Sequence, residues 1–151
     1  MCASGRNKQV REWIDVTGVR CRESCPQEEE DTRENFERLW SNETQWPGGV
    51  LPAEGDNVTI PYEWNLILDI DPPILNYIEL NGILSFKPDK ASSTLQAKYI
   101  WVNLGVLKAG TQEAPFTGQI DIILHGEKDD NYLVIDPQAS GNKMLAVTGG
   151  L

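Results

Sequence analysis

The sequence predicts an all-β protein, built as a short β-solenoid of the right-handed parallel β-helix type with one short N-terminal helix. Two observations favour this fold. Seven apolar segments are each too short for a helix and rich in β-branched or aromatic residues. Glycines that follow three of these segments recur after 23 and then 21 residues. A β-sandwich is the alternative, because short strands with regular turns also describe that fold.

Length and charge limit the class of protein. The chain has 151 residues, 40% of them hydrophobic, which suits one domain with its own core. Its net charge of −10 argues against a nucleic-acid partner and against docking on anionic membranes through a basic face. No apolar run reaches the roughly 18 residues of a membrane span, so we expect no direct membrane insertion. The uncapped end and the lack of a signal-like start suggest a fragment of a longer chain.

The first 38 residues differ from the rest and are expected to contain the helix. Pro26 precedes a run of acidic residues that is followed by arginines, an order that suits the dipole of a short helix. Phe36, Leu39 and Trp40 fall at i, i+3 and i+4 and would form one apolar stripe. We expect this helix to pack on an edge of the main domain, and a partner-binding helix is the alternative.

All three cysteines lie in this first part of the chain. Cys21 and Cys25 are spaced for a local disulfide, and Cys2 is able to pair with either. The odd count leaves one thiol free or paired outside this sequence. A zinc site is the rival interpretation, but its fourth ligand would have to be the distant His125, and we expect no metal.

Two glycosylation sequons indicate the compartment. Asn42-Glu43-Thr44 and Asn57-Val58-Thr59 both fit Asn-x-Ser/Thr without an intervening proline. Together with a possible disulfide they favour an extracellular setting, with Asn42 and Asn57 as candidate glycan carriers.

From about residue 46, turn-rich segments alternate with the seven apolar ones. The expected strands are residues 58–60, 66–70, 77–80, 83–86, 99–102, 106–107 and 120–124. The repeating units are Ile78-x-Leu80 before Gly82, Ile100-x-Val102 before Gly105, and Ile120-x-Ile122-x-Leu124 before Gly126. Each unit predicts strand, glycine turn, strand, and stacked units would form an inward ladder of apolar side chains. We expect the glycines to take φ values that other residues resist.

Residues able to support catalysis or metal binding are few. The only histidine, His125, precedes a turn glycine, as an exposed loop residue does. Carboxylates occur in pairs: Glu54 with Asp56, Asp69 with Asp71, and Asp129 with Asp130. Aspartate favours turns, and this explains the pairs without a catalytic role. We therefore expect no catalytic residue and no cofactor; calcium binding by loop carboxylates stays open, although the EF-hand pattern is absent.

Aromatic residues offer a possible binding surface. Trp40 and Trp46 are expected to cover the open end of the solenoid, because terminal coils need a cap. The alternative is a sugar-stacking platform on the solenoid face, formed by both of them with Trp64, Trp101, Tyr62 and Tyr99. Trp101 lies between Ile100 and Val102, and strand alternation points it outward, which makes it the candidate ligand contact.

The order of these motifs resembles the G8 domain family. The resemblance covers residues 39–126 and begins with Leu39-Trp40-Ser41, Gln45-Trp46-Pro47-Gly48-Gly49-Val50-Leu51-Pro52 and Glu54-Gly55-Asp56-Asn57-Val58-Thr59-Ile60-Pro61. It continues through Leu68-Asp69, Leu80-Asn81-Gly82-Ile83-Leu84-Ser85-Phe86, Leu95-Gln96-Ala97-Lys98-Tyr99-Ile100-Trp101-Val102, Gly105-Val106-Leu107 and Ile120-Asp121-Ile122-Ile123-Leu124-His125-Gly126. Within the family, the residues of these motifs are similar to those of the fibrocystin-like branch.

The resemblance implies an extracellular β-rich module of a large membrane-anchored or secreted protein, with no catalytic residues to carry over. We expect an N-terminal extension at 1–38, the G8-like domain at 39–128, and a further coil or the start of another domain at 129–151. The expected partners are neighbouring domains of the same chain, and an extracellular glycan or protein ligand. A glycan-binding accessory domain of a hyaluronan-processing protein is the alternative, and a self-sufficient polysaccharide-cleaving enzyme is the least favoured interpretation.

Overall fold

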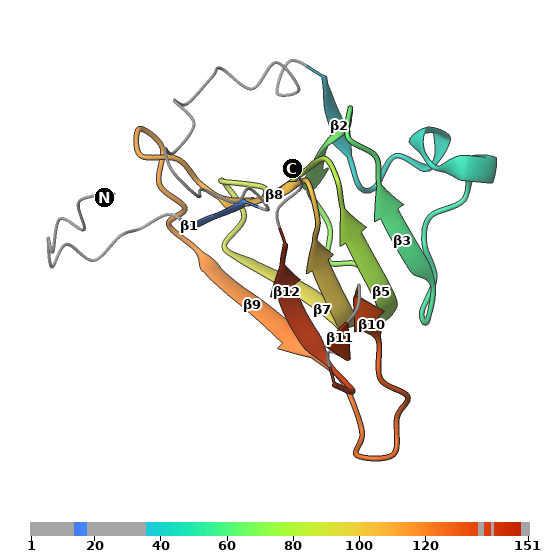
Figure 1. Ribbon diagram of the computed structural model, residues 1–151. Coiled ribbons are helices and arrows are strands. Elements are labelled where there is room, and N and C mark those ends of the chain that lie inside the picture. The colour runs from blue at the N-terminus through green and yellow to red at the C-terminus, as the bar shows by residue number, and fades with distance from the viewer. Residues whose placement is uncertain (1–13, 18–35, 136–137, 140, 149–151) are drawn as a thin grey trace, which may run out of the picture.

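A computed structural model describes residues 14–17, 36–135, 138–139 and 141–148 (Figure 1). Its regular elements are strands, apart from two short 3-10 turns, η2 (Glu43–Gln45) and η3 (Pro47–Gly49). The strands form two facing sheets, and the chain passes from one sheet to the other and back as it advances. The expected all-β solenoid is therefore confirmed, in place of a sandwich.

The first sheet has the order β1-β8-β6-β4-β2. Its strands are β2 (Glu37–Leu39), β4 (Asn65–Leu68), β6 (Ile83–Phe86), β8 (Val106–Ala109) and β1 (Ile14–Thr17). The pairs from β2 to β8 are parallel, and β1 is antiparallel to β8. The first sheet therefore grows by one strand per coil and ends under a strand from the start of the chain.

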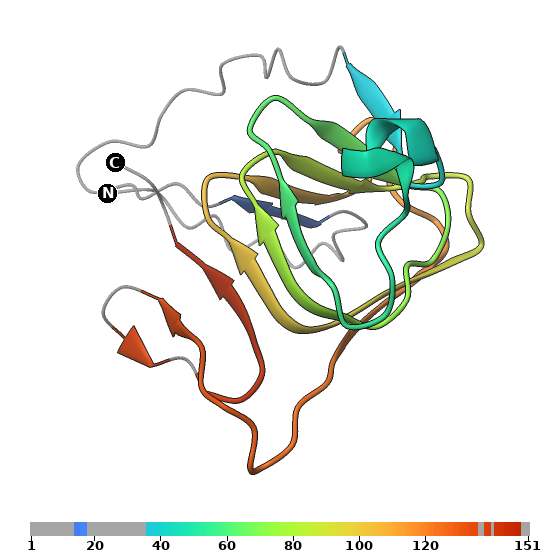
Figure 2. The ribbon, with the colours of Figure 1, turned by 90° about the vertical axis from the view of Figure 1, so that its right-hand side faces the viewer.

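The second sheet has the order β12-β7-β5-β3 and is parallel throughout. Its strands are β3 (Asn57–Ile60), β5 (Leu75–Leu80), β7 (Ser92–Val102) and β12 (Met144–Val147), and β9 (Gln119–Leu124) also pairs with β7. Figure 2 shows the second sheet curving around the core opposite the first. All seven strands expected from the sequence are present.

The core is an in-register ladder of aliphatic side chains between the two sheets. In the second sheet Ile60 lies beside Leu80 and Leu80 beside Val102, and all three are fully buried. In the first sheet Leu66 and Leu84 lie in the same register and are also fully buried. Burying each such side chain contributes about 1.5–3 kcal/mol, so the ladder is a main source of stability.

The pairing between β5 and β7 is interrupted at Asn76 and Lys98. The register joins Leu75 to Ala97 and then Tyr77 to Tyr99, and omits the pair between them. At the same place the other edge of β7 changes partner: β9 pairs with its first six residues, before Lys98, and β12 with its last four, after Lys98. Residues 125–143 separate these two strands and contain the hairpin of β10 (Val134–Ile135) and β11 (Gln138–Ala139), away from the stacked coils (Figure 2).

The prediction of an N-terminal helix is wrong in the part of that segment that the structure describes. Glu37–Leu39 is a strand that pairs with β4, and the rest of the expected helix lies outside the described residues. Phe36 is 71% exposed and Leu39 44%, whereas Trp40 is fully buried, so they share no apolar stripe. The open edge of β4 supplies backbone partners that overrule the weak helical preference of the segment.

The third repeating unit is also placed differently. Its spacing predicts that residues 120–124 stack beside Ile100-x-Val102. They do pair with β7, but nearer its start: Ile122 pairs with Leu95, and it is Leu145 that pairs with Ile100. The reason is the length of β7, whose first half offers β9 a free edge as soon as the chain returns. Among the described residues no second strand of the unit follows Gly126, where the chain leaves the stacked coils before it returns as β12.

Gly82 and Gly105 are required for close backbone contact between coils. The Gly105 amide donates to the Leu80 carbonyl at 3.0 Å, and the Val106 amide donates to the Gly82 carbonyl at 2.9 Å. A Cβ on Gly105 would lie 2.3 Å from the Gly82 oxygen, and one on Gly82 would lie 2.2 Å from the Pro61 oxygen. Neither has the positive φ that we expected, so the recurring glycine reflects close approach between stacked turns.

We expect Gly105→Ala to lower the free energy of unfolding by about 3 kcal/mol, because the added methyl meets backbone atoms that cannot rotate away. Gly141→Ala is the matched control: φ is +83° there and the space around it is open, so only backbone strain of about 1–2 kcal/mol is expected. Urea unfolding of both variants measures the difference. Equal losses would contradict a role in coil stacking.

Candidate interaction surfaces

Asp69 and Asp71 form one of the carboxylate pairs noted in the sequence. In the structure they join neighbouring coils. Asp69 accepts hydrogen bonds from the Ser41 amide at 3.0 Å and the Ser41 hydroxyl at 2.5 Å. Asp71 accepts from the Lys90 ammonium at 2.5 Å and the Thr94 amide at 2.9 Å. Asp69 fixes a turn against the preceding coil and Asp71 against the next, so the expected turn chemistry is present.

These contacts shift the acidity of both groups. Burial acts to raise the pKa of Asp69, but the hydrogen bonds from Ser41 outweigh it and hold the pKa below its ordinary value. Burial acts in the same direction on Asp71, and there the contacts with Lys90 and Thr94 lower the pKa overall. Both carboxylates are therefore anionic at neutral pH, and both already accept hydrogen bonds from neighbouring residues.

The remaining acidic pairs and His125 lie elsewhere. Asp56 accepts from the Ala53 amide at 2.8 Å, and Asp130 forms an ion pair with Lys98 at 2.8 Å. A ring nitrogen of His125 lies 3.0 Å from the Gln96 side-chain oxygen, an amide partner. A shallow depression of about 330 Å³ brings His125 together with Glu54 and Asp130, a proximity that the sequence alone did not indicate. Among the described residues, no cluster of three or more His, Cys, Asp or Glu side chains is arranged to hold a metal ion.

Three tryptophans close the end of the solenoid formed by β2 and β3. The rings of Trp40 and Trp46 meet edge to face with centroids 4.8 Å apart, and the Trp46 ring lies 5.8 Å from that of Trp64. The Trp46 indole N–H donates to the Trp40 carbonyl at 2.9 Å, and Arg38 lies over Trp64 at 4.6 Å. Trp40 is fully buried and Trp46 is 6% exposed, so they form the expected cap and cannot serve as a sugar platform.

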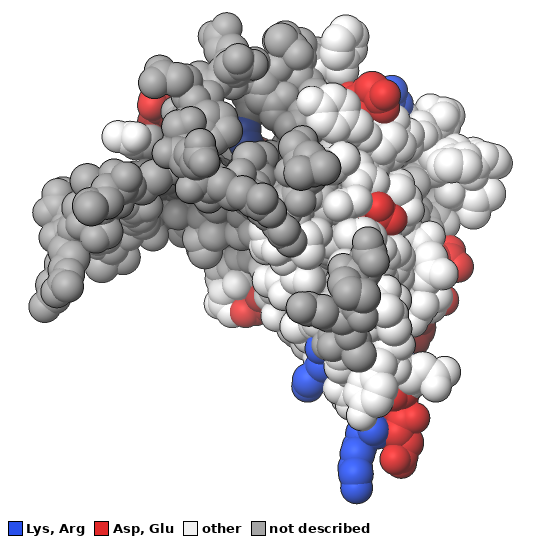
Figure 3. Space-filling model, in the orientation of Figure 1, with Lys and Arg blue, Asp and Glu red and all other residues white. Residues whose placement is uncertain are grey.

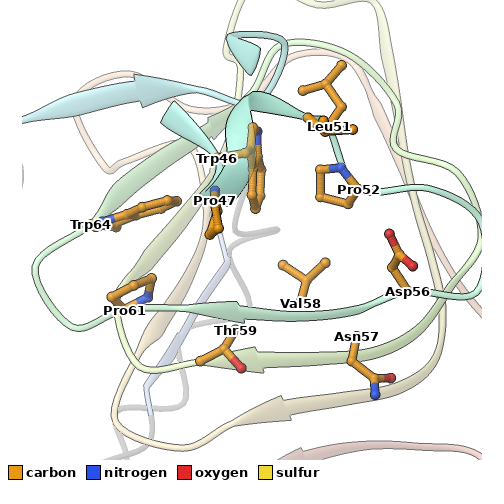
Figure 4. A pocket seen from close by; sticks show the side chains of 11 residues that line it. Trp46, Pro47, Leu51, Pro52, Asp56, Asn57, Val58, Thr59, Pro61 and Trp64 are labelled. Atoms are coloured by element: carbon orange, nitrogen blue, oxygen red, sulfur yellow. The ribbon is translucent and has the colours of Figure 1, made fainter. Parts of the chain in front are cut away.

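A groove of about 330 Å³ runs beside this cap along β3 (Figure 4). Val58 forms its floor, Trp46 and Trp64 lie at one end, and Pro52 lies across from the strand. Among the described residues β3 pairs only with β5, so this groove borders an open strand edge. Sequence reasoning missed the groove, although the prolines at 47, 52 and 61 mark the places where the chain departs from strand pairing.

Trp101 lies on the outer face of the second sheet, as strand alternation predicts. It is partly exposed and stands in register between Glu79 of β5 and Ala146 of β12. Its indole N–H donates to the Thr148 hydroxyl at 2.6 Å, which fixes the orientation of the ring. Its role as a ligand contact stays a prediction.

Glu79 organises the polar groups beside Trp101. One of its oxygens accepts from the side-chain amides of Asn81 at 3.1 Å and Asn103 at 3.3 Å. The other accepts from the Tyr77 hydroxyl at 3.4 Å. Partial burial and the charge of Glu79 raise the pKa of Tyr77 to about 12. The result is a fixed row of carboxylate, amides and aromatic rings across successive coils.

The opposite end of the solenoid leaves its core partly open. Ile122, Leu145 and Val147 continue the inward ladder, in register with Leu95, Ile100 and Val102. They are 38%, 41% and 46% exposed, whereas the residues they pair with are fully buried. The sequence did contain a signal for this coil: Val147, Thr148 and Gly150 repeat the spacing of Val102, Asn103 and Gly105.

The predicted modification sites fall in different settings. Asn42 is half-buried and caps η2, where its side-chain oxygen accepts from the Thr44 amide at 3.2 Å and the Thr44 hydroxyl at 2.8 Å. Asn57 is exposed on β3. Cys2, Cys21 and Cys25 lie outside the described residues.

Charged side chains are dispersed on the described part of one face of the molecule. On the face in Figure 3, acidic groups are separated by uncharged surface and basic groups form no patch. No helix within the described ranges is long and apolar enough to cross a membrane.

These features define a short parallel β-solenoid with a capped end, an open end and an exposed sheet face. The family model for the G8 domain matches residues 45–151. The chain belongs to the G8 domain family, and the resemblance seen in its motifs is confirmed.

Similar proteins place the domain in large chains. The sequence is 36% identical to human fibrocystin-L over 114 residues and 30% identical to mouse fibrocystin-L over 128 residues. It is 31% identical to dog fibrocystin over 112 residues. The matches cover 74–75% of this chain but only 2–3% of those relatives, so in them the domain is a small module. No solved structure matches the chain.

We expect Asp69→Asn to reduce stability at pH 7 and to matter less as the pH falls. The folded-state pKa of Asp69 lies below its ordinary 3.8, so its carboxylate stabilises the fold above about pH 4. That contribution is lost as the pH falls through the folded-state pKa. Thermal unfolding between pH 2 and 7 measures the difference, with Asp89→Asn as control because Asp89 is exposed and its ion pair with Lys87 is long, at 3.7 Å. A difference between wild type and Asp69→Asn that stays constant with pH would contradict this role.

Proposed function

We propose that this G8 domain is a non-catalytic extracellular module with a structural, adhesive or ligand-binding role in a large fibrocystin-like protein. Its main partner, in this proposal, is a neighbouring domain of the same chain. The observation that carries the proposal is the difference between the two ends of the solenoid.

At the capped end, the first inward residues of the second sheet are covered. Val58 is 4% exposed and Ile60 fully buried, because Trp46 and its neighbours pack over them. At the other end, Leu145 and Val147 hold the same ladder positions and remain almost half exposed. Burying apolar surface contributes about 25 cal/mol per Å², so a covering element would stabilise this end.

A neighbouring domain is the occupant that fits best. The surface to be covered is narrow and apolar, and β12 offers a strand edge beside it, so the complementary surface is a β-element with aliphatic side chains. In relatives where the matched region is 2–3% of the length, most of the same chain lies outside this domain. Linkage within one chain raises the effective concentration of the partner and makes a small interface sufficient.

The placement of polar groups supports a non-catalytic role. Asp69, Asp71 and Asp130 have partners that fix turns and loops, and His125 pairs with an amide. General acid–base chemistry needs a titratable group that is free to reach a substrate. His125 and Asp130 line a shallow depression, but His125 contacts Gln96 and Asp130 pairs with Lys98. The sequons at Asn42 and Asn57 support the extracellular setting.

We expect Lys143, which directly precedes β12 and is exposed, to cross-link to another domain in the intact gene product when an amine-reactive reagent is used. Leu145→Asp should lower these cross-links at least threefold, because a charge that amine reagents do not modify enters the apolar end surface. Ile123→Asp is the control: Ile123 is equally exposed, at 41%, but does not lie on the inward ladder. Cross-linking mass spectrometry gives the measurement. Cross-links confined to these 151 residues, or equal losses in both variants, would contradict the proposal.

Glycan binding is the second candidate, favoured by Trp101 beside Glu79 on the outer face. An aromatic ring with a fixed carboxylate and amides is a combination that stacks on and hydrogen-bonds to a sugar.

On a glycan array, we expect binding by the wild type to fall at least tenfold in Trp101→Ala and less in Trp101→Phe, which keeps a stacking face. Thr148→Val removes the partner of the indole N–H and leaves the ring, so it controls for local rearrangement. If the wild type binds no glycan, this second candidate is discarded. Polymeric hyaluronan should keep its size throughout.

A further inference from the structure

The open edge of β3 is an exposed feature that the proposed function does not use. In the part of the chain that the structure describes, no strand pairs with its free side, and the groove of Figure 4 separates β3 from the turn that contains Pro52. The Asn81 amide donates to the Ile60 carbonyl, so the backbone of Val58 and Ile60 faces β5. Because parallel strands alternate, the backbone groups of Asn57 and Thr59 face the groove.

Within the strand itself, this edge lacks two of the features that protect edges from pairing with another chain. Edge strands are commonly protected by charged side chains and by prolines within the strand, as well as by bulges, shortness or a covering loop. At the same end of the solenoid, the edge strand β2 has Glu37 and Arg38 among its three residues. In contrast, β3 is Asn57-Val58-Thr59-Ile60, with neither a charge nor a proline.

The sequon Asn57-Val58-Thr59 lies wholly within this strand. Val58 points into the core and is 4% exposed, while Asn57 and Thr59 are exposed on the outer face. The Asn57 side-chain oxygen accepts from the Asn76 amide at 2.6 Å. That bond leaves the Asn57 amide nitrogen, the atom that carries an N-linked sugar, available at the surface.

We propose that Asn57 carries an N-linked glycan and that this glycan protects the β3 edge from pairing with another strand. A hydrophilic and bulky oligosaccharide anchored in the edge strand occupies the space that an added strand would need. The inference rests on the extracellular setting of the proposed function. The second sequon, at Asn42, provides an internal control because Asn42 is half-buried, caps η2 and is not itself part of a strand.

The test begins with site occupancy. The chain is secreted from mammalian cells, and glycopeptide mass spectrometry measures the occupied fraction at Asn57 and Asn42. We expect Asn57 to be mostly occupied. A glycan at Asn42 with none at Asn57 overturns this inference alone, whereas native material without glycan at either site overturns the extracellular setting as well.

The second step measures self-association. Light scattering after size exclusion should show a several-fold larger oligomer fraction for Asn57→Gln than for the wild type, and no change for Asn42→Gln. Asn57→Lys also loses the glycan but places a charge on the edge, so it should stay monomeric. An Asn57→Gln protein as monomeric as the wild type overturns the protective role, as does an Asn57→Lys protein that associates equally.

Discussion

The fold depends on the close, in-register contact of successive coils. The stacked turns at Gly82 and Gly105 show how tight this contact is, because each position would place a side chain within the van der Waals radius of the preceding turn. Backbone hydrogen bonds from Gly105 and Val106 hold the turn at that distance. Once the turns are fixed, the strands on either side must stack in one register, and every inward aliphatic residue then lies on another. The ladder of Ile60, Leu80 and Val102 follows from this constraint.

The same register places the polar groups of the surface. Asn103 lies on Asn81, and the Asn103 amide donates to the Asn81 side-chain oxygen at 3.1 Å, while Glu79 accepts from both residues. At the opposite turns Asp69 reaches back to Ser41, and Asp71 reaches forward to Lys90 and Thr94. Acidic residues that look like candidate catalytic pairs in the sequence therefore connect adjacent coils. A periodic backbone brings like positions together, so a carboxylate in one turn meets the donors of the next.

Sequence patterns predicted the repetitive part of the fold and failed where repetition stops. The strands that stack between two others and are followed by a glycine turn were predicted correctly, because the apolar pattern of the sequence agrees with the packing there. The segment at 36–40 has a helical spacing of apolar residues, yet the edge of β4 makes it a strand. The displacement of β9 came from the length of β7, which a repeat of 21 to 23 residues does not reveal. Trp101 was placed correctly because alternation is local, whereas the groove beside β3 depends on a turn and a strand edge that only the three-dimensional fold brings together.

The two ends of a solenoid expose its apolar core unless something covers them. In this chain one end is covered and the other is only partly covered. Three tryptophans cover the core at one end, and at the other β1 covers the edge of the first sheet while β9 and β12 leave the second sheet open. A cap on both ends would make the domain self-contained and leave few apolar contacts for a partner. An opening at one end only gives a direction to any further stacking, because the tryptophan cap excludes another coil from that side. The open edge of β3 lies beside the cap and has no charged side chain. Stacking is therefore restricted to the other end only if something else prevents another strand from pairing with β3. The sequon within β3 satisfies that requirement, since a glycan blocks the edge without adding a charged side chain to the packed strand.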